Sequence, residues 1–120
     1  MTRRAVLAPA MVWFFMLVSC STKASAAFLV SSGNGLLAAC QDEDPFNRGV
    51  CYGYILGIDE ATAWIAESGS IIHACLPQDV SVGQLRDVVV RWLEVYPERR
   101  PYSAASLVTA ALAEAFPCKN

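Results

Sequence analysis

Apolar residues return every three or four positions along three long segments of this chain, which is the spacing of one face of an α-helix. The three segments cover residues 47–65, 82–96 and 103–116. The positions expected to face a core are Cys51, Tyr54, Ile55, Ile58, Thr62 and Ile65 in the first segment, Val82, Leu85, Val89, Trp92, Leu93 and Tyr96 in the second, and Ala104, Leu107, Val108, Ala111, Leu112, Ala115 and Phe116 in the third. The run of valines at 88–90 would favour a strand by itself, but the helical periodicity around it outweighs that local preference.

Polar residues at the expected helix starts support these assignments. Ser81 and Gln84 form the capping-box pattern that opens the helix over 82–96. Asn34 is placed to cap a further, shorter helix that ends at Cys40. The sequence therefore predicts an all-α fold, a small bundle of about four helices.

Gly53 and Gly57 lie four positions apart on one face of the helix predicted over 47–65. Glycine inside a helix costs about 1 kcal/mol relative to alanine. Two glycines on one face indicate close packing against another backbone, although a stable helix can also tolerate them.

The first residues of the chain have the pattern of a signal peptide. Two arginines precede an apolar run of fourteen residues over 5–18, which is shorter than the roughly 20 residues of a membrane-spanning helix. The small residues at 24–26 then form a signal peptidase site. We therefore expect a signal peptide at 1–26, an exported domain at 27–120 and a periplasmic protein.

A second interpretation of this segment remains open. The stretch from Leu17 to Cys20 resembles a bacterial lipobox, which would make 1–19 a lipoprotein signal. Lipidation at Cys20 would then tether the protein to a membrane, and this is the only membrane contact that we expect. Both routes export the protein.

The formal net charge of the whole chain, −2, hides an acidic mature domain. From residue 27 onward there are six basic and eleven acidic residues, which gives a net charge of −5. The chain therefore lacks the basic footprint of a nucleic-acid-binding protein. An acidic domain suits a basic protein partner, although many acidic proteins are simply soluble.

Four cysteines remain after export, and an even number in a small exported chain predicts disulfide bridges. Cys40 ends the first predicted helix and Cys51 begins the second, so an antiparallel turn brings them together. Cys75 precedes the third helix and Cys118 follows the fourth, so antiparallel packing of these two helices does the same. Among the three possible pairings we predict the bridges Cys40–Cys51 and Cys75–Cys118.

The same residues argue against a metal site and a catalytic centre. A zinc site would use His73 and Cys75, but the chain has no C-x-x-C pair and the compartment oxidises thiols. His73, two residues from Cys75, is also poorly placed to act as a general base on it. Asp59 and Glu60 are helical neighbours that point about 100° apart, so they do not converge on one substrate. We therefore expect no metal, no cofactor and no enzymatic activity.

The segment from Cys51 to Ala61 resembles the C-x-G-Y-x-x-G-x-x-D-A helix of Rap/Tai-type immunity proteins. In that family the aspartate sits one residue later, and here the acidic pair Asp59-Glu60 stands at the position. Other parts of the chain resemble the family in the same order: Cys75–Pro77, Gln84–Val89, Tyr96–Glu98, Ala104–Ala105 and Ala111–Cys118. The likeness covers residues 28–118.

This resemblance implies a small all-helical periplasmic immunity protein that neutralises a peptidoglycan amidase effector delivered by type VI secretion. Such proteins protect the producing cell and its kin by blocking the active-site cleft of the amidase. The family includes homodimers in which a loop enters that cleft. The connector Glu98–Pro101 is very short in this chain, and this departure puts an inserted-loop mechanism in doubt.

Candidate partner-binding residues follow from charge and exposure. The acidic loop ahead of the second helix, with the acidic pair inside that helix, would steer a basic amidase, although a solvated loop has the same composition. An aromatic residue on the side away from the core would anchor an interface, or would pack under a neighbouring loop. These residues are Asp42, Glu43, Asp44, Tyr52, Asp59 and Glu60. The alternative function is that of a periplasmic binding or stress protein, or an envelope lipoprotein, with the same fold and no toxin partner.

Overall fold

A computed structural model describes residues 30–69 and 72–119. Within these ranges the chain forms α1 (Gly33–Gln41), α2 (Pro45–Ala66), α3 (Val82–Val95), a short 3-10 helix η2 (Pro97–Arg99) and α4 (Ala104–Ala115). No β-strand occurs in the described residues, where an isolated antiparallel bridge joins Ser32 and Ser103. The predicted all-α bundle is therefore confirmed.

The expected signal peptide and the alternative lipidation site Cys20 lie outside the described residues. No helix in the described part of the chain is long and apolar enough to cross a membrane. Export and anchoring therefore stay predictions from the sequence.

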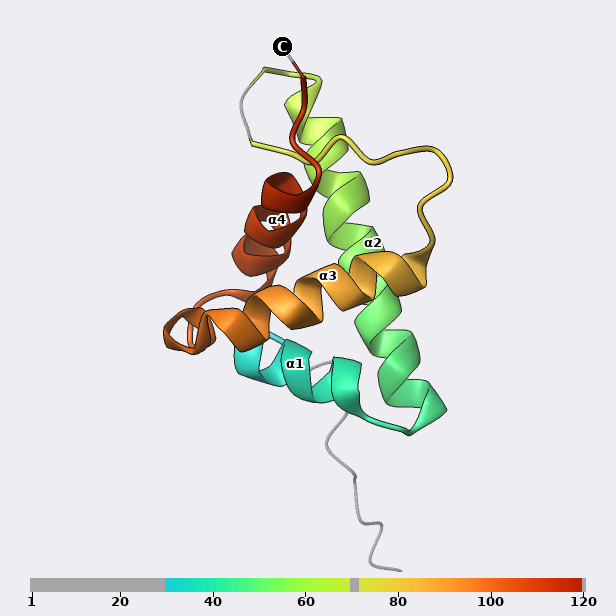
Figure 1. Ribbon diagram of the computed structural model, residues 1–120, viewed down its shortest axis with the longest axis vertical. Coiled ribbons are helices and arrows are strands. Elements are labelled where there is room, and N and C mark those ends of the chain that lie inside the picture. The colour runs from blue at the N-terminus through green and yellow to red at the C-terminus, as the bar shows by residue number, and fades with distance from the viewer. Residues whose placement is uncertain (1–29, 70–71, 120) are drawn as a thin grey trace, which may run out of the picture.

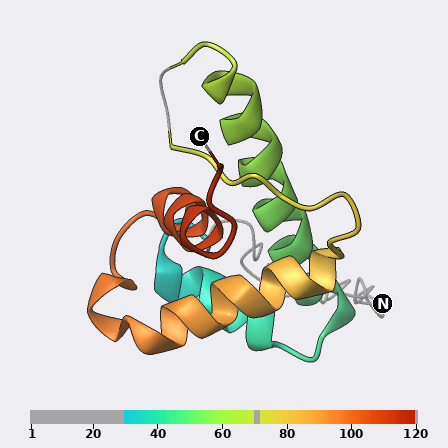
Figure 2. The same ribbon diagram turned by 45° about the horizontal axis from the view of Figure 1, so that its top comes forward.

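The helices pack around one core, with α2 as the longest element. In Figure 1, α2 runs upright, α3 crosses it near its middle, α1 lies beside its lower half, and α4 lies beside its upper half. Figure 2 shows α4 end-on, above α3 and beside α2. The segment that follows α2 returns past the end of the chain, where Cys75 N donates a hydrogen bond to Phe116 O at 2.9 Å.

Each helix contributes apolar side chains from one face to this core. The buried hydrophobic residues are Val30, Leu36, Leu37, Ala39, Cys40, Cys51, Ile55, Leu85, Val89, Trp92, Leu93, Ala104, Leu107, Val108, Ala111 and Leu112. All those from α3 and α4 belong to the faces that the periodicity predicts. On α2 only Cys51 and Ile55 are buried, and other positions of its predicted face, such as Ile58, are half-buried.

The residue that caps α1 differs from the prediction, whereas the cap of α3 is the predicted one. Ser32 caps α1 in place of Asn34, because Gly35 N donates to Ser32 Oγ at 3.3 Å. The capping box at the start of α3 is present: Gln84 N donates to Ser81 Oγ at 3.2 Å, and Ser81 N donates to Gln84 Oε1 at 2.8 Å.

The start of α2 lies two residues before the position near Asn47 that the sequence predicts. Asp44 caps this helix, since its Oδ1 accepts hydrogen bonds from Phe46 N at 2.9 Å and Asn47 N at 3.2 Å. Pro45 occupies the first helical position, where its missing N–H would have no partner in any case. The acidic loop therefore provides the cap that extends α2.

The start of α1 is held against the connector between η2 and α4. Gly33 N donates to Tyr102 O at 3.1 Å, and Ala104 N donates to Ser31 O at 3.0 Å. A Cβ atom added at Gly33 would lie 2.5 Å from Leu107 Cδ1. The absence of a side chain at Gly33 is what allows this close approach.

Two arginines cap helix C-termini from other parts of the fold. Arg86, on α3, donates from Nε and Nη2 to Cys40 O at 3.1 and 2.7 Å, near the end of α1. Arg100 donates from Nε to Leu93 O at 2.6 Å and from Nη2 to Glu94 O at 3.3 Å, near the end of α3. The last carbonyl groups of a helix have no partner within the helix, so these contacts satisfy them.

Both predicted disulfides are present, Cys40–Cys51 and Cys75–Cys118. The first closes the turn between α1 and α2, and the second joins the loop before α3 to the segment after α4. Their cysteines are 11 and 43 positions apart. The chain-entropy model therefore gives about 3 kcal/mol of stabilisation for the first bridge and about 4 kcal/mol for the second.

Two glycine-to-alanine substitutions are expected to change stability in opposite directions. Gly33→Ala places a methyl group against Leu107 and is expected to lower the free energy of unfolding by about 1–3 kcal/mol. Gly53→Ala adds a carbon with no described atom within 4 Å and is expected to raise it by about 0.5–1 kcal/mol. Urea denaturation of both variants and the parent measures the two signs. Equal changes in the free energy of unfolding for the two variants would contradict the conclusion that Gly33 is closely packed and Gly53 is not.

Candidate functional site

Asp42, Glu43 and Asp44 form an exposed acidic turn between α1 and α2. Asp44 N donates to Asp42 Oδ1 at 2.8 Å, and Asn47 Nδ2 donates to Asp42 Oδ2 at 2.7 Å. These two hydrogen bonds stabilise the charged carboxylate, so they lower the pKa of Asp42 from its usual value of 3.8. The disulfide Cys40–Cys51 also closes the turn and restrains its backbone.

The side of α2 that points away from the core is open and largely apolar, and we call it the outer face. It consists of Phe46, Gly49, Gly53, Leu56, Gly57, Glu60 and Trp64. These positions share one side because residues three and four apart are neighbours on a helix surface. The exposed fractions of Phe46, Leu56 and Trp64 are 67%, 41% and 74%. Large apolar side chains along one exposed stripe make the outer face a candidate interaction surface.

Gly49, Gly53 and Gly57 run along the outer face at intervals of four residues. A Cβ atom added at any of the three would meet no described atom within 4 Å. Within the described residues, Gly53 and Gly57 therefore do not pack against another backbone, although the sequence predicts that they would. Each glycine costs about 1 kcal/mol relative to alanine, and packing within the described chain does not explain that cost.

The structure separates the six residues that the sequence proposes for partner binding. Asp42–Asp44 form the acidic turn at the start of α2, and Glu60 is exposed further along the outer face. Tyr52 is half-buried and packs against the core. Asp59 is half-buried, and the charge of His73, which follows α2 in the sequence, acts to lower its pKa. The role of all six in binding stays a prediction.

Sequence reasoning misses Phe46, Leu56 and Trp64. The sequence pattern that could have identified them is their position opposite the predicted apolar face, where an amphipathic helix usually carries polar residues. Apolar residues on both sides of a helix indicate that the second side also has a partner. The three glycines between them obscure this signal, because they add no apolar side chains of their own.

The pKa of Asp59 is raised above its usual value of 3.8. Partial burial disfavours the charged carboxylate most, and the charge of the neighbouring Glu60 acts in the same direction, while His73 acts against both. A charged Asp59 therefore opposes folding at neutral pH, whereas the hydrogen-bonded carboxylate of Asp42 favours it.

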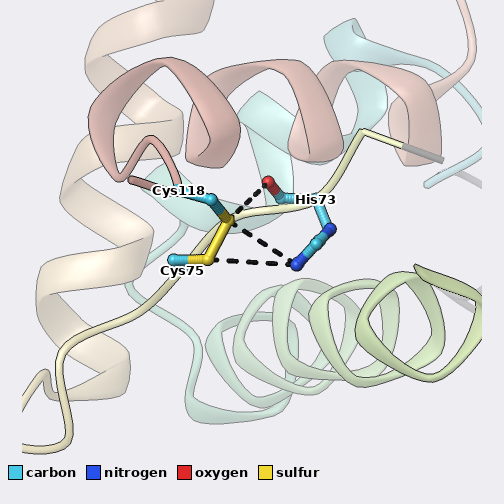
Figure 3. Close-up of side chains that lie close together, drawn as sticks. All are labelled: His73, Cys75 and Cys118. Carbon is cyan, nitrogen blue, oxygen red and sulfur yellow. Dashed lines mark hydrogen bonds between the residues drawn. A yellow bond between two sulfur atoms is a disulfide. The ribbon is translucent and has the colours of Figure 1, made fainter. Parts of the chain in front are cut away.

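Figure 3 shows the imidazole of His73 beside the bridge between Cys75 and Cys118. His73 Nε2 lies 3.6 Å from Cys118 Sγ and 3.9 Å from Cys75 Sγ. His73 therefore lies near Cys75, but a bridged sulfur has no thiol proton to give up, so the expectation that His73 is no general base for Cys75 stays a prediction. Residues 72–77 are not helical, and in an extended chain the side chains at i and i+2 point to the same side. Both sulfurs are held in the disulfide, so neither is a free thiol nucleophile.

Residues 32–118 match the family model of the Rap1a immunity proteins. The chain belongs to the Rap1a immunity protein family. The match includes the four helices, both disulfides, the acidic turn and the outer face of α2. No curated protein and no solved structure matches the chain.

Membership of the Rap1a family confirms the resemblance to Rap/Tai-type immunity proteins. It makes the protein an immunity protein against a secreted effector, and this implies that it binds an effector protein as its partner. Within the Rap1a domain, the acidic turn and the outer face of α2 are exposed features that suit such binding.

Replacing Asp59 and Asp42 by asparagine is expected to alter stability with opposite signs. Asp59→Asn removes a carboxylate whose pKa is raised on folding, so it should stabilise the protein at neutral pH, and this gain should fade as the pH falls to 3.8. Asp42→Asn removes a carboxylate whose pKa is lowered on folding, so it should destabilise the protein above pH 3.8, and this loss should vanish in stronger acid. Urea midpoints measured from about pH 7 to about pH 2 check both. Parallel pH profiles for the two variants would contradict the assigned shifts.

Proposed function

We propose that this protein is a periplasmic immunity protein that binds and inhibits a peptidoglycan amidase effector delivered by type VI secretion, and so protects the producing cell. Support comes from the family match over 32–118 and from the likeness of the 51–61 helix to amidase immunity proteins. The signal-peptide pattern at 1–26 and the two disulfides suit the periplasm, where thiols are oxidised. The protein acts by binding and performs no chemistry on the amidase.

The observation that carries this proposal is the apolar outer face of α2 beside the acidic turn. The exposed charged residues along α2 and this turn are Asp42, Glu43, Asp44, Arg48, Glu60 and Glu67. All but one of these are acidic. An apolar centre with an acidic border suits a partner surface that is apolar in its middle and basic at its edge.

The outer face has the length of a protein–protein interface. Phe46 and Trp64 lie near its ends and are 18 positions apart, which is about 27 Å along a helix that rises about 1.5 Å per residue. A standard interface buries about 800 Å² on each partner. A round patch of that area is about 32 Å across, so the outer face together with the acidic turn is of comparable length.

The glycines leave the centre of the outer face without side chains. A partner segment can therefore approach the backbone of α2 closely at Gly53 and Gly57. Phe46 and Trp64 then serve as anchors on either side, since aromatic residues carry a large share of binding energy in interfaces. The acidic turn is ordered before binding, which lowers the entropic cost of association.

Protection of cells tests the function. The full chain, produced together with an exported amidase effector encoded beside it, should prevent lysis, and the mature protein should inhibit peptidoglycan cleavage at stoichiometric amounts. A chain without residues 1–26 should still inhibit the purified amidase but should no longer protect cells. Failure of the full chain to bind the amidase or to protect against it would contradict the proposal. Sedimentation of the mature protein tests the homodimer, which stays a prediction.

Two substitutions on the outer face should weaken effector binding for different reasons. Trp64→Ala removes an anchor that is 74% exposed, and a loss of about 30-fold in affinity is expected of such a residue. Gly53→Leu puts a side chain where the partner approaches, and a loss of at least about tenfold is expected from the clash. Isothermal titration with the amidase measures both affinities.

Stability and a matched aromatic control make this test specific. Gly53→Leu should leave the free energy of unfolding unchanged or higher, because the new Cβ meets no described atom within 4 Å. Tyr102→Ala is the control for Trp64→Ala, since Tyr102 is 67% exposed but lies in the connector before α4. If the outer-face variants bind normally while the parent inhibits the amidase, the function stands and the interface lies elsewhere.

A further inference from the structure

Three atoms of the kind that bind metals converge at the disulfide between the loop before α3 and the segment after α4. They are His73 Nε2, Cys75 Sγ and Cys118 Sγ, and all lie within 4.8 Å of one another. Figure 3 shows the imidazole turned toward both sulfurs. His73 is the only histidine of the chain, and neither the proposed binding of an effector nor the packing of the core uses it.

The distances in this cluster are already close to those of a tetrahedral zinc site. With Zn–S bonds of about 2.3 Å and Zn–N bonds of about 2.0 Å, a sulfur and a nitrogen on one ion lie about 3.5 Å apart. His73 Nε2 lies 3.6 Å from Cys118 Sγ and 3.9 Å from Cys75 Sγ. Only the two sulfurs have to separate, to about 3.8 Å, once they are no longer bonded to each other.

We propose that, when the Cys75–Cys118 bridge is reduced, His73, Cys75 and Cys118 bind one Zn²⁺ ion, with water in the fourth position. A dithiol reductant supplies two electrons and two protons, becomes a disulfide itself, and leaves two cysteine thiols. Zinc then replaces the two thiol protons, which go to solvent, and His73 binds through neutral Nε2. Two thiolates and an imidazole are donors that select zinc over magnesium or calcium.

The two disulfides differ in exposure to solvent, and the proposed site requires that only Cys75–Cys118 be reduced. Cys75 is exposed, whereas Cys40 and Cys51 have no exposed surface. Thiol–disulfide exchange depends on access to a sulfur atom. A reductant acting on the folded protein therefore opens Cys75–Cys118 and leaves the buried bridge intact.

A neighbouring hydrogen bond supports the metal-binding geometry. Cys75 N donates to Phe116 O at 2.9 Å, and this hydrogen bond keeps the two chain segments together after the bridge opens. Zinc at this position would keep the loop before α3 tied to the end of α4 in the reduced protein.

Zinc titration of gently reduced protein tests the site. A phosphine reductant is applied under native conditions until mass spectrometry finds alkylatable thiols at Cys75 and Cys118 alone; the phosphine becomes its oxide with oxygen from water. Zn²⁺ is then titrated against a chromophoric chelator, and Co²⁺ serves as a spectroscopic substitute. We expect one ion per chain, and with Co²⁺ the visible bands of tetrahedral coordination together with thiolate charge-transfer bands.

His73→Ala is expected to weaken zinc binding at least about 100-fold while the disulfide form remains folded. The double variant Cys75→Ser/Cys118→Ser keeps the buried bridge and is expected to bind no zinc under the same conditions. Circular dichroism of each reduced sample monitors its helices. The proposal fails if His73→Ala binds as tightly as the parent or the double variant binds zinc. It also fails if the reduced parent binds none, or loses its helices and does not regain them with zinc.

Discussion

Burial of one side of α2 is the constraint on which the rest of this structure depends. The helix α2 packs against the other three helices, and Cys51 and Ile55 on it have no exposed surface. A helix that buries one side presents its opposite side to solvent. Because α2 is the longest helix, that opposite side becomes a long face with Phe46 and Trp64 near its ends. The glycines between them do not serve packing within the described chain, so their cost in helix stability is consistent with a role in binding.

Cross-links supplement a core of modest size and also order the exposed surfaces. The bridge Cys40–Cys51 closes the acidic turn, and Arg86 binds the carbonyl oxygen of Cys40 at the same end of α1. The bridge Cys75–Cys118 ties the loop before α3 to the end of α4 and brings His73 with it. The contacts that hold the fold together are therefore also those that position the charged turn and the histidine.

Local patterns predict much of this fold, because helix periodicity and capping act between neighbours in the sequence. The Ser81–Gln84 capping box matches the prediction, and every buried residue of α3 and α4 lies on a predicted face, although Ala115 of that face is exposed. The start of α2 differs by two residues, since the cap comes from Asp44, which the composition of the loop presents only as a surface charge. Tyr52 shows the limit of this reasoning for the candidate site: its place on the helix suggests exposure, but its ring packs against the core.

The sequence by itself determined the helical class, the order of the helices, the disulfide pairing and the family, because these follow from periodicity, spacing and ordered motifs. Only the tertiary structure decided that the glycine side of α2 stays open, that Gly33 lies against another segment, and that His73 faces both sulfurs. These features depend on contacts between distant parts of the chain; His73 and Cys118 are 45 positions apart. Local sequence patterns do not encode the distance between such residues, which is set by how the helices pack.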